Sequence, residues 1–71
     1  MEGNVARLIG EKGFGFIKTE NGVDYFFHRQ DFAGLFDELI YMVDSGQHIK
    51  VTFDVVPSPK GPRAANVRLL E

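Results

Sequence analysis

Apolar and polar residues alternate along several short stretches of the chain, which is the pattern of β-strands with two different faces. The most regular stretch is 47–56, where every second residue from Ile49 to Val55 is apolar. Less regular stretches predict four more strands, at 4–9, 13–19, 23–28 and 64–70. The alternation in 4–9 is broken, so we expect a bulge or a strong bend in that strand.

Residues 30–46 have a different spacing. Apolar residues recur there at intervals of three and four, which predicts a short α-helix or 3₁₀ segment. These residues are Leu35, Phe36, Leu39, Ile40 and Val43. Gly46 follows them and is suited to end a helix, because glycine adopts the left-handed conformation that commonly closes one.

The connections between the predicted strands carry turn signals. Asn21-Gly22 predicts a hairpin between the second and third strands. The segment 57–62 holds three prolines and must be an exposed loop, since proline cannot continue a strand ladder. We therefore predict one all-β domain over 1–71, a five-stranded antiparallel barrel of the OB type with a short helical segment between strands 3 and 4. An RNA-recognition-motif sheet is the main rival, but the chain lacks room for its two full helices.

Two aromatic-rich segments, 12–17 and 24–28, lie a short turn apart. Residues two apart on a strand share a face, so a hairpin would place four rings together. They are Phe14, Phe16, Phe26 and His28. Flat rings beside a cation such as Lys12 are what unpaired nucleic-acid bases stack on. The alternative is that these phenylalanines are core residues, but Ile17 has the opposite parity and is the better core candidate.

The opposite face of the third predicted strand carries Val23, Tyr25 and Phe27, which we assign to the barrel core. In the second strand, Gly13 and Gly15 alternate with the phenylalanines. Glycine weakens a strand interior unless the backbone must curve or approach another segment closely. The two glycines therefore indicate a tightly coiled barrel strand.

Charge and composition limit the kinds of molecule that the protein is expected to bind. The net charge of −2 argues against binding driven by bulk positive charge, but not against stacking supported by local cations. Cations in or beside the predicted binding strands and loops are Arg7, Lys12, Lys18, Arg29, Lys60 and Arg63. The chain has no cysteine, which suits a reducing cytoplasm, and we expect a cytoplasmic protein. No apolar run approaches the ~20 residues of a membrane span, and the first residues do not form a signal peptide.

Catalytic and metal-binding functions find little support. The chain has two histidines, His28 and His48, and no carboxylate cluster stands at ligand spacing with them. Gly13-Phe14-Gly15 lacks the Lys-Ser/Thr that follows in a phosphate-binding loop, and no nucleophile stands beside a base. We expect no enzyme, no cofactor or metal and no small-molecule substrate.

Three separated motifs resemble the cold-shock domain family. Lys12–Ile17 is similar to its first RNP-type motif, Asp24–His28 to its second, and Gly61–Val67 to its closing G-P-x-A-A-N-V. The opening Glu2–Val5 fits as well. The resemblance implies a five-stranded OB-type barrel that binds single-stranded RNA or DNA and often acts as a nucleic-acid chaperone. It also implies that Phe36 lies near a stacking position and that a cation at Lys60 lines the groove.

The chain departs from the family pattern at three aromatic positions. The family commonly has tryptophan at Arg7, phenylalanine at Leu8 and an aromatic residue at Arg29. Arginine can stack on a base and also pair with phosphate, so binding could persist with greater sensitivity to salt. The other interpretation is that the site has drifted toward weak or altered binding, because each stacking contact contributes ~1–3 kcal/mol.

The segment 34–46 is longer and more apolar than the usual family loop, and Ile40–Val43 has no counterpart there. It either caps the end of the barrel or forms a protein-contact surface. We accordingly expect a monomer, with a weak dimer through Ile40–Val43 as the alternative.

The sequence thus predicts a single-stranded nucleic-acid-binding protein of low sequence specificity. The alternative is a divergent barrel that serves as a protein-interaction module. The predicted binding residues are Arg7, Lys12, Phe14, Phe16, Phe26, His28, Arg29, Phe36, Lys60 and Arg63.

Overall fold

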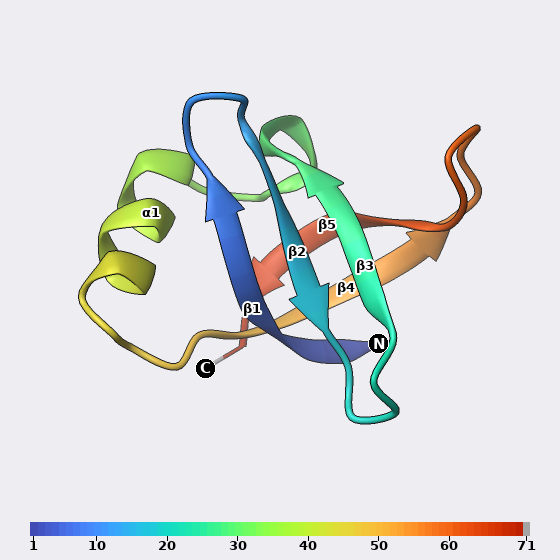
Figure 1. Ribbon diagram of the computed structural model, residues 1–71, viewed down its shortest axis with the longest axis horizontal. Helices are drawn as coiled ribbons and strands as arrows, with labels where there is room; N and C mark the ends of the chain where they lie inside the picture. Colours follow the sequence, from blue (N-terminus) through green and yellow to red (C-terminus); the bar gives the residue numbers. More distant parts are fainter. Residues whose placement is uncertain (71) are drawn as a thin grey trace.

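Five strands close into a single barrel (Figure 1). The structure is a computed structural model and describes residues 1–70. Its elements are β1 (Glu2–Ile9), β2 (Phe14–Lys18), β3 (Asp24–His28), a 3₁₀ turn η1 (Arg29–Asp31), α1 (Phe36–Asp44), β4 (Lys50–Val56) and β5 (Arg63–Leu69). The order around the barrel is β1-β2-β3-β5-β4. The predicted OB-type barrel with one short helix is therefore confirmed.

One strand pairing differs from the antiparallel expectation. β3 and β5 run parallel and meet at the pair Phe26–Arg63, whereas the other neighbouring strands are antiparallel. Strands joined by a hairpin must run antiparallel, but β3 and β5 are separated by η1, α1 and β4, so no such constraint applies to them. This parallel pair closes the barrel.

The broken alternation in β1 is a bulge, as expected. Val5 pairs with Ile17 of β2, and the next recorded pair is Arg7 with Phe16, so Ala6 is an extra residue. The extra residue shifts the alternation by one position, so the side chain of Arg7 points outward although that of Val5, two residues earlier, points inward. Val5 therefore packs against the core, and Arg7 is exposed beside Phe16.

The barrel core is aliphatic and aromatic. Ile17, Phe27 and Val51 are completely buried, which agrees with the parity of their strands. The assignment of Val23 to the core is wrong, because its side chain is 42% exposed. Val23 precedes β3 and belongs to the hairpin turn, where its carbonyl accepts a 3.0 Å hydrogen bond from the Thr19 N–H.

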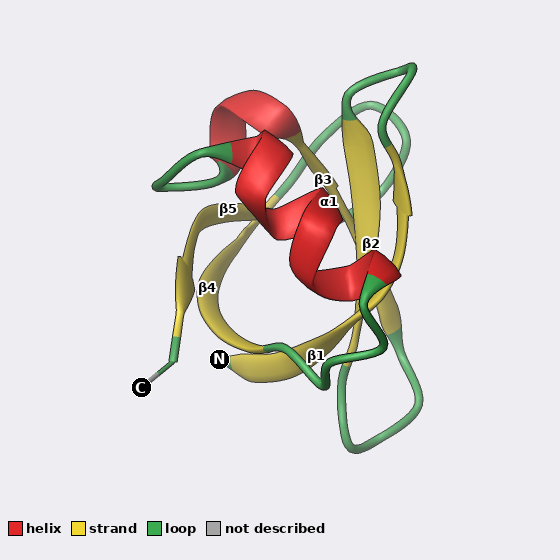
Figure 2. Ribbon diagram, turned by 90° about the vertical axis from the view of Figure 1, so that its left-hand side faces the viewer, coloured by secondary structure: helices red, strands yellow, loops and turns green. Residues whose placement is uncertain are grey.

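The helix α1 lies across one end of the barrel (Figure 2). Its first residue, Phe36, is buried, and Ile40, Met42 and Val43 pack against the core. Gly46 ends it as expected, with a φ of 83°. The backbone N–H groups of residues 46 and 47 donate to carbonyls of the last turn at 3.0 and 3.3 Å, which satisfies groups that a helix end would otherwise leave unpaired. The interpretation of 34–46 as a barrel cap is confirmed.

Gly15 permits a close approach inside the barrel. A β-carbon at this position would lie 2.8 Å from the Arg7 carbonyl oxygen and 2.9 Å from the Phe27 ring. Gly13, by contrast, is not in a strand. It has a φ of 71° and lies in the turn between β1 and β2, where its N–H donates to the Ile9 carbonyl at 2.9 Å. The two glycines thus meet different needs, one of space and one of backbone conformation.

Candidate nucleic-acid interface

The register of β2 with β3 places the predicted rings on one outer face. Phe14 pairs with His28, and Phe16 pairs with Phe26. The intervening pair, Gly15 with Phe27, faces the core. Phe14, Phe16, Phe26 and His28 are each partly exposed, and we refer to these four residues as the aromatic face.

The three phenylalanines of the aromatic face contact one another. The ring centroid of Phe14 is 5.9 Å from that of Phe16 and 5.2 Å from that of Phe26, and those of Phe16 and Phe26 are 6.0 Å apart. The interplanar angles run from 42° to 88°, so the contacts are tilted or edge-to-face. Aromatic pairs prefer this geometry. The rings therefore hold one another in place, and little side-chain freedom remains to be lost when a base stacks on them.

The end of β3 fixes the orientation of His28. Its Nδ1 accepts a 3.3 Å hydrogen bond from the backbone N–H of Gln30. The backbone N–H of His28 donates to Asp31 Oδ2 at 3.0 Å. Together these bonds form a capping box around η1. An accepting Nδ1 leaves Nε2 as the protonated nitrogen of the neutral ring, and so as the available hydrogen-bond donor.

Arg63 lies on the barrel and not in the proline-rich loop. It is the first residue of β5 and pairs with Phe26. Its Nη2 is 3.4 Å from Asp31 Oδ1, and the Asp31 side chain is only 12% exposed. Sequence reasoning missed Asp31, although its place three residues after His28 is a capping-box spacing. The contact with Arg63 has no sequence signal, because it depends on how β5 meets β3.

Two arginines flank the paired rings of Phe16 and Phe26. Arg7 pairs with Phe16 across β1 and β2, and Arg63 pairs with Phe26 across β3 and β5. Two other predicted cations, Lys12 and Lys60, are exposed on loops, one between β1 and β2 and one leading into β5. Asp31 offsets the charge of Arg63, so Arg7, Lys12 and Lys60 are the exposed cations among these four residues.

The expectation that Phe36 adds a stacking ring is wrong. Phe36 is 5% exposed, and its ring centroid lies 6.2 Å from that of the buried Phe27. The helix begins at Phe36 and directs this residue into the end of the barrel. Arg29 lies over this ring, with its guanidinium carbon 5.7 Å from the centre of the Phe36 ring. Arg29 therefore covers the helix end of the barrel by a cation–π contact.

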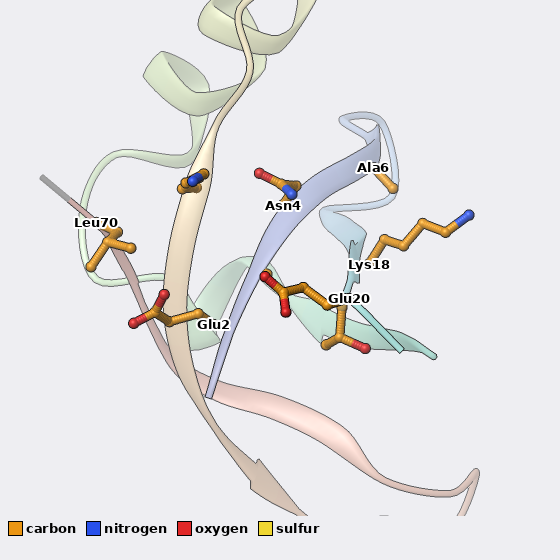
Figure 3. A pocket seen from close by; sticks show the side chains of 9 residues that line it. Glu2, Asn4, Ala6, Lys18, Glu20 and Leu70 are labelled. Carbon is orange, nitrogen blue, oxygen red and sulfur yellow. The ribbon is translucent and has the colours of Figure 1, made fainter. Parts of the chain in front are cut away.

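Two of the hollows that border β1–β3 bear on the predicted site. One, of about 320 Å³, lies at the end of β3 and is lined by Phe26, His28, Gln30, Asp31 and Arg63; we call it the Arg63 hollow. The other, of about 330 Å³, lies along β1 (Figure 3). Glu2, Glu20, Lys18 and Lys50 all line this second hollow. Its two carboxylates offset its two ammonium groups, so it offers no preference for an anionic backbone.

Within residues 1–70, no cluster of three or more potential metal ligands is present. No helix in that range has the length and apolar character needed to cross a membrane.

A closed five-stranded barrel of the OB type, with an exposed cluster of rings on β2 and β3, defines a class of small β-barrel binding proteins. The chain belongs to the cold-shock domain family: the family model described as 'Cold-shock' DNA-binding domain matches residues 1–70. This membership supports nucleic-acid binding at the level of the family.

Curated relatives agree with the family match. The chain is 43% identical over 67 residues to the cold shock protein CspC of Bacillus subtilis, with 94% of each chain covered. It is 40% identical to the cold shock-like protein CspC of Bacillus cereus, covering 94% of this chain and 95% of the relative. It is 42% identical over 69 residues to the major cold shock protein of Streptococcus pyogenes serotype M18, covering 97% and 96%.

Proposed function

We propose that this protein binds single-stranded nucleic acid by stacking unpaired bases on the aromatic face. The observation that carries the proposal is the contact among Phe14, Phe16 and Phe26 on the outside of the barrel. Rings that pack on one another outside the core expose apolar area that has no structural use there. Stacking tolerates any base, because every base has a π-face. The proposed binding is therefore of low sequence specificity over most of the site.

Local cations complement the stacking. Arg7 lies beside Phe16, Lys12 lies in the loop that leads into β2, and Lys60 lies in the loop that leads into β5. Each phosphate contact in a single strand contributes about −0.7 to the slope of log K against log salt. With few cations near the rings and a net charge of −2, we expect a shallow slope of roughly −2.

A site of this kind acts as a nucleic-acid chaperone without chemistry. Base faces are accessible in a single strand and covered in a duplex, so the protein binds the open form preferentially. Binding to one of two states shifts the equilibrium toward it by mass action. Both RNA and DNA expose such faces, and we expect the protein to bind both.

The interaction-module alternative has less support in the structure. It rests on the missing tryptophan, where the chain has Arg7, and on Ile40–Val43, yet Ile40, Met42 and Val43 pack against the barrel core. Tyr41 alone in this segment is mostly exposed, at 66%. One exposed tyrosine is ordinary on a protein surface. It does, however, provide a matched control for the binding experiment.

The proposal is tested by fluorescence anisotropy with a labelled oligothymidine and an oligouridine at several salt concentrations. We expect Phe26→Ala to weaken binding by ~1–3 kcal/mol, since it removes one stacking contact. Tyr41→Ala removes an exposed ring away from the aromatic face and should leave the affinity unchanged. Circular dichroism establishes that both variants remain folded.

Equal affinity of folded Phe26→Ala and the unmodified protein would reject stacking on this face. Absence of saturable binding to either strand at low salt would reject single-stranded nucleic acid as the ligand and leave the interaction module as the function to pursue.

A further inference from the structure

We infer that the Arg63 hollow recognises one base of the bound strand and gives the protein a preference for guanine at that position. This inference rests on the proposed function, because the base must first be held against Phe26. The hollow is lined by Phe26 and His28 of the aromatic face and, beyond them, by Gln30, Asp31 and Arg63. A base stacked on Phe26 can therefore place one edge among polar side chains.

The polar groups of the hollow are fixed in position. Asp31 accepts the His28 N–H with one oxygen and lies 3.4 Å from the Arg63 guanidinium with the other. The backbone of Arg63 is fixed as well, by its pairing with Phe26. The Arg63 side chain is thus held by its backbone at one end and by Asp31 at the other. It loses little freedom when it forms a further hydrogen bond.

The charge of the hollow favours a base edge over a phosphate. Arg63 and Asp31 together carry no net charge, and Phe26 and Gln30 are uncharged. A phosphate brought here would approach the carboxylate that already holds the arginine. A base edge is neutral and carries both donors and acceptors, so it matches a guanidinium next to a carboxylate.

Arginine donors select guanine among the four bases. Guanine presents two neighbouring acceptors, O6 and N7, which match the fork of a guanidinium. Adenine has a donor in place of O6, and the pyrimidines have no N7. Among residues 1–70, Arg63 Nε is buried and lacks a hydrogen-bond partner. A buried unpaired donor is costly, so this guanidinium has hydrogen-bonding capacity that the described residues do not use.

Asp31 is a positioning residue in this scheme. It orients Arg63 and cancels its charge, so that Arg63 serves hydrogen bonding and not general attraction of the backbone. Asn at position 31 keeps an oxygen that can accept the His28 N–H, so the capping box can persist. Asp31→Asn therefore separates the electrostatic role of Asp31 from its part in the fold.

The experiment measures dissociation constants for oligothymidine seven-mers in which one thymidine is replaced by guanosine in its 2′-deoxy form, at each position in turn. The unmodified protein should bind the best guanosine-containing strand about tenfold more tightly than oligothymidine. Replacing that guanosine by 7-deazaguanosine, which lacks N7, should remove most of the gain.

Three variants assign the preference to the hollow. Arg63→Lys keeps the charge but loses the fork, so the ratio of the two affinities, for the guanosine-containing strand and for oligothymidine, should fall to about one. Asp31→Asn should reduce the gain and steepen the salt slope by about 0.7, because Arg63 becomes an uncancelled cation. Lys60→Gln, a control on the adjoining loop, should make the salt slope shallower and leave the preference unchanged.

The outcomes distinguish this inference from the proposed function. Binding to oligothymidine with no gain from guanosine at any position overturns the inference and leaves the proposed function intact. A gain that survives both Arg63→Lys and 7-deazaguanosine also overturns it. If Arg63→Gln weakens all strands equally and makes the salt slope shallower, Arg63 contacts phosphate and the inference is wrong. No binding to any strand overturns both.

Discussion

Phe14 and Phe36 are the same residue type in two different environments. Phe14 contacts Phe16 and Phe26 on the outside of the barrel, whereas Phe36 lies at the barrel end against Phe27. Their substitutions should therefore affect different properties: binding in the first case and stability in the second.

We expect Phe36→Ala to lower the free energy of unfolding by ~3–5 kcal/mol, because it opens a cavity in a small core. Urea denaturation measures this loss. Phe36→Leu keeps most of the volume and should cost less than about 1.5 kcal/mol, with affinity for oligothymidine unchanged. A folded Phe36→Leu variant with weakened binding would show that the ring does reach a base, against its burial in the structure.

At the scale of single elements, the inner side of β2 tolerates no side chain at Gly15. A β-carbon there would meet the backbone carbonyl of Arg7 and the ring of the buried Phe27. Neither neighbour can move freely, since one is backbone in a paired strand and the other is fully buried. The short distance between β1 and β2 therefore depends on this glycine.

Gly15→Ala should lower the free energy of unfolding by ~1–3 kcal/mol, as overpacking does in other cores. Gly10→Ala is the control. Its added carbon would be closest to Ile40 Cδ1, at 3.0 Å, which is the end of a flexible side chain. Thermal unfolding of the two variants should show a large loss for the first and a small one for the second. Equal losses would mean that the tight contact at Gly15 is not what limits the barrel.

Sequence patterns predict these elements to the extent that each depends on its own residues. The parity of 14–18 and 24–28 predicts the aromatic face, and the spacing from Leu35 to Val43 predicts the helix. The exposure of Val23 was not predictable from alternation, because it depends on where the turn ends. Burial of Phe36 depends on how α1 packs on the barrel, and the contact of Asp31 with Arg63 depends on β5 meeting β3. Both are tertiary effects.

At the scale of the whole molecule, β2 and β3, which carry the aromatic face, lie side by side in the barrel wall, and the helix lies across one end (Figures 1 and 2). The net charge of −2 means that attraction to the backbone is weak away from the rings. If the protein binds as we propose, access to base faces decides which nucleic acids bind, and duplexes should bind far more weakly than single strands.

An oligonucleotide hairpin labelled with a fluorophore and a quencher tests this preference. Excess protein should increase the fluorescence in the absence of ATP, because binding to the open strand shifts the opening equilibrium. Phe26→Ala should reduce the increase, and Tyr41→Ala should not. If the unmodified protein binds single strands but leaves the hairpin closed, the affinity is insufficient for a chaperone role.

The parallel pair of Phe26 with Arg63 has a consequence for the order in which the protein acquires its activity. During synthesis Phe26 leaves the ribosome long before Arg63. A nascent chain that ends before β5 has the residues of the ring cluster but neither a closed barrel nor the guanidinium that flanks those rings. The base recognition that we propose for the Arg63 hollow would thus be the last property to appear, in the same step that completes folding.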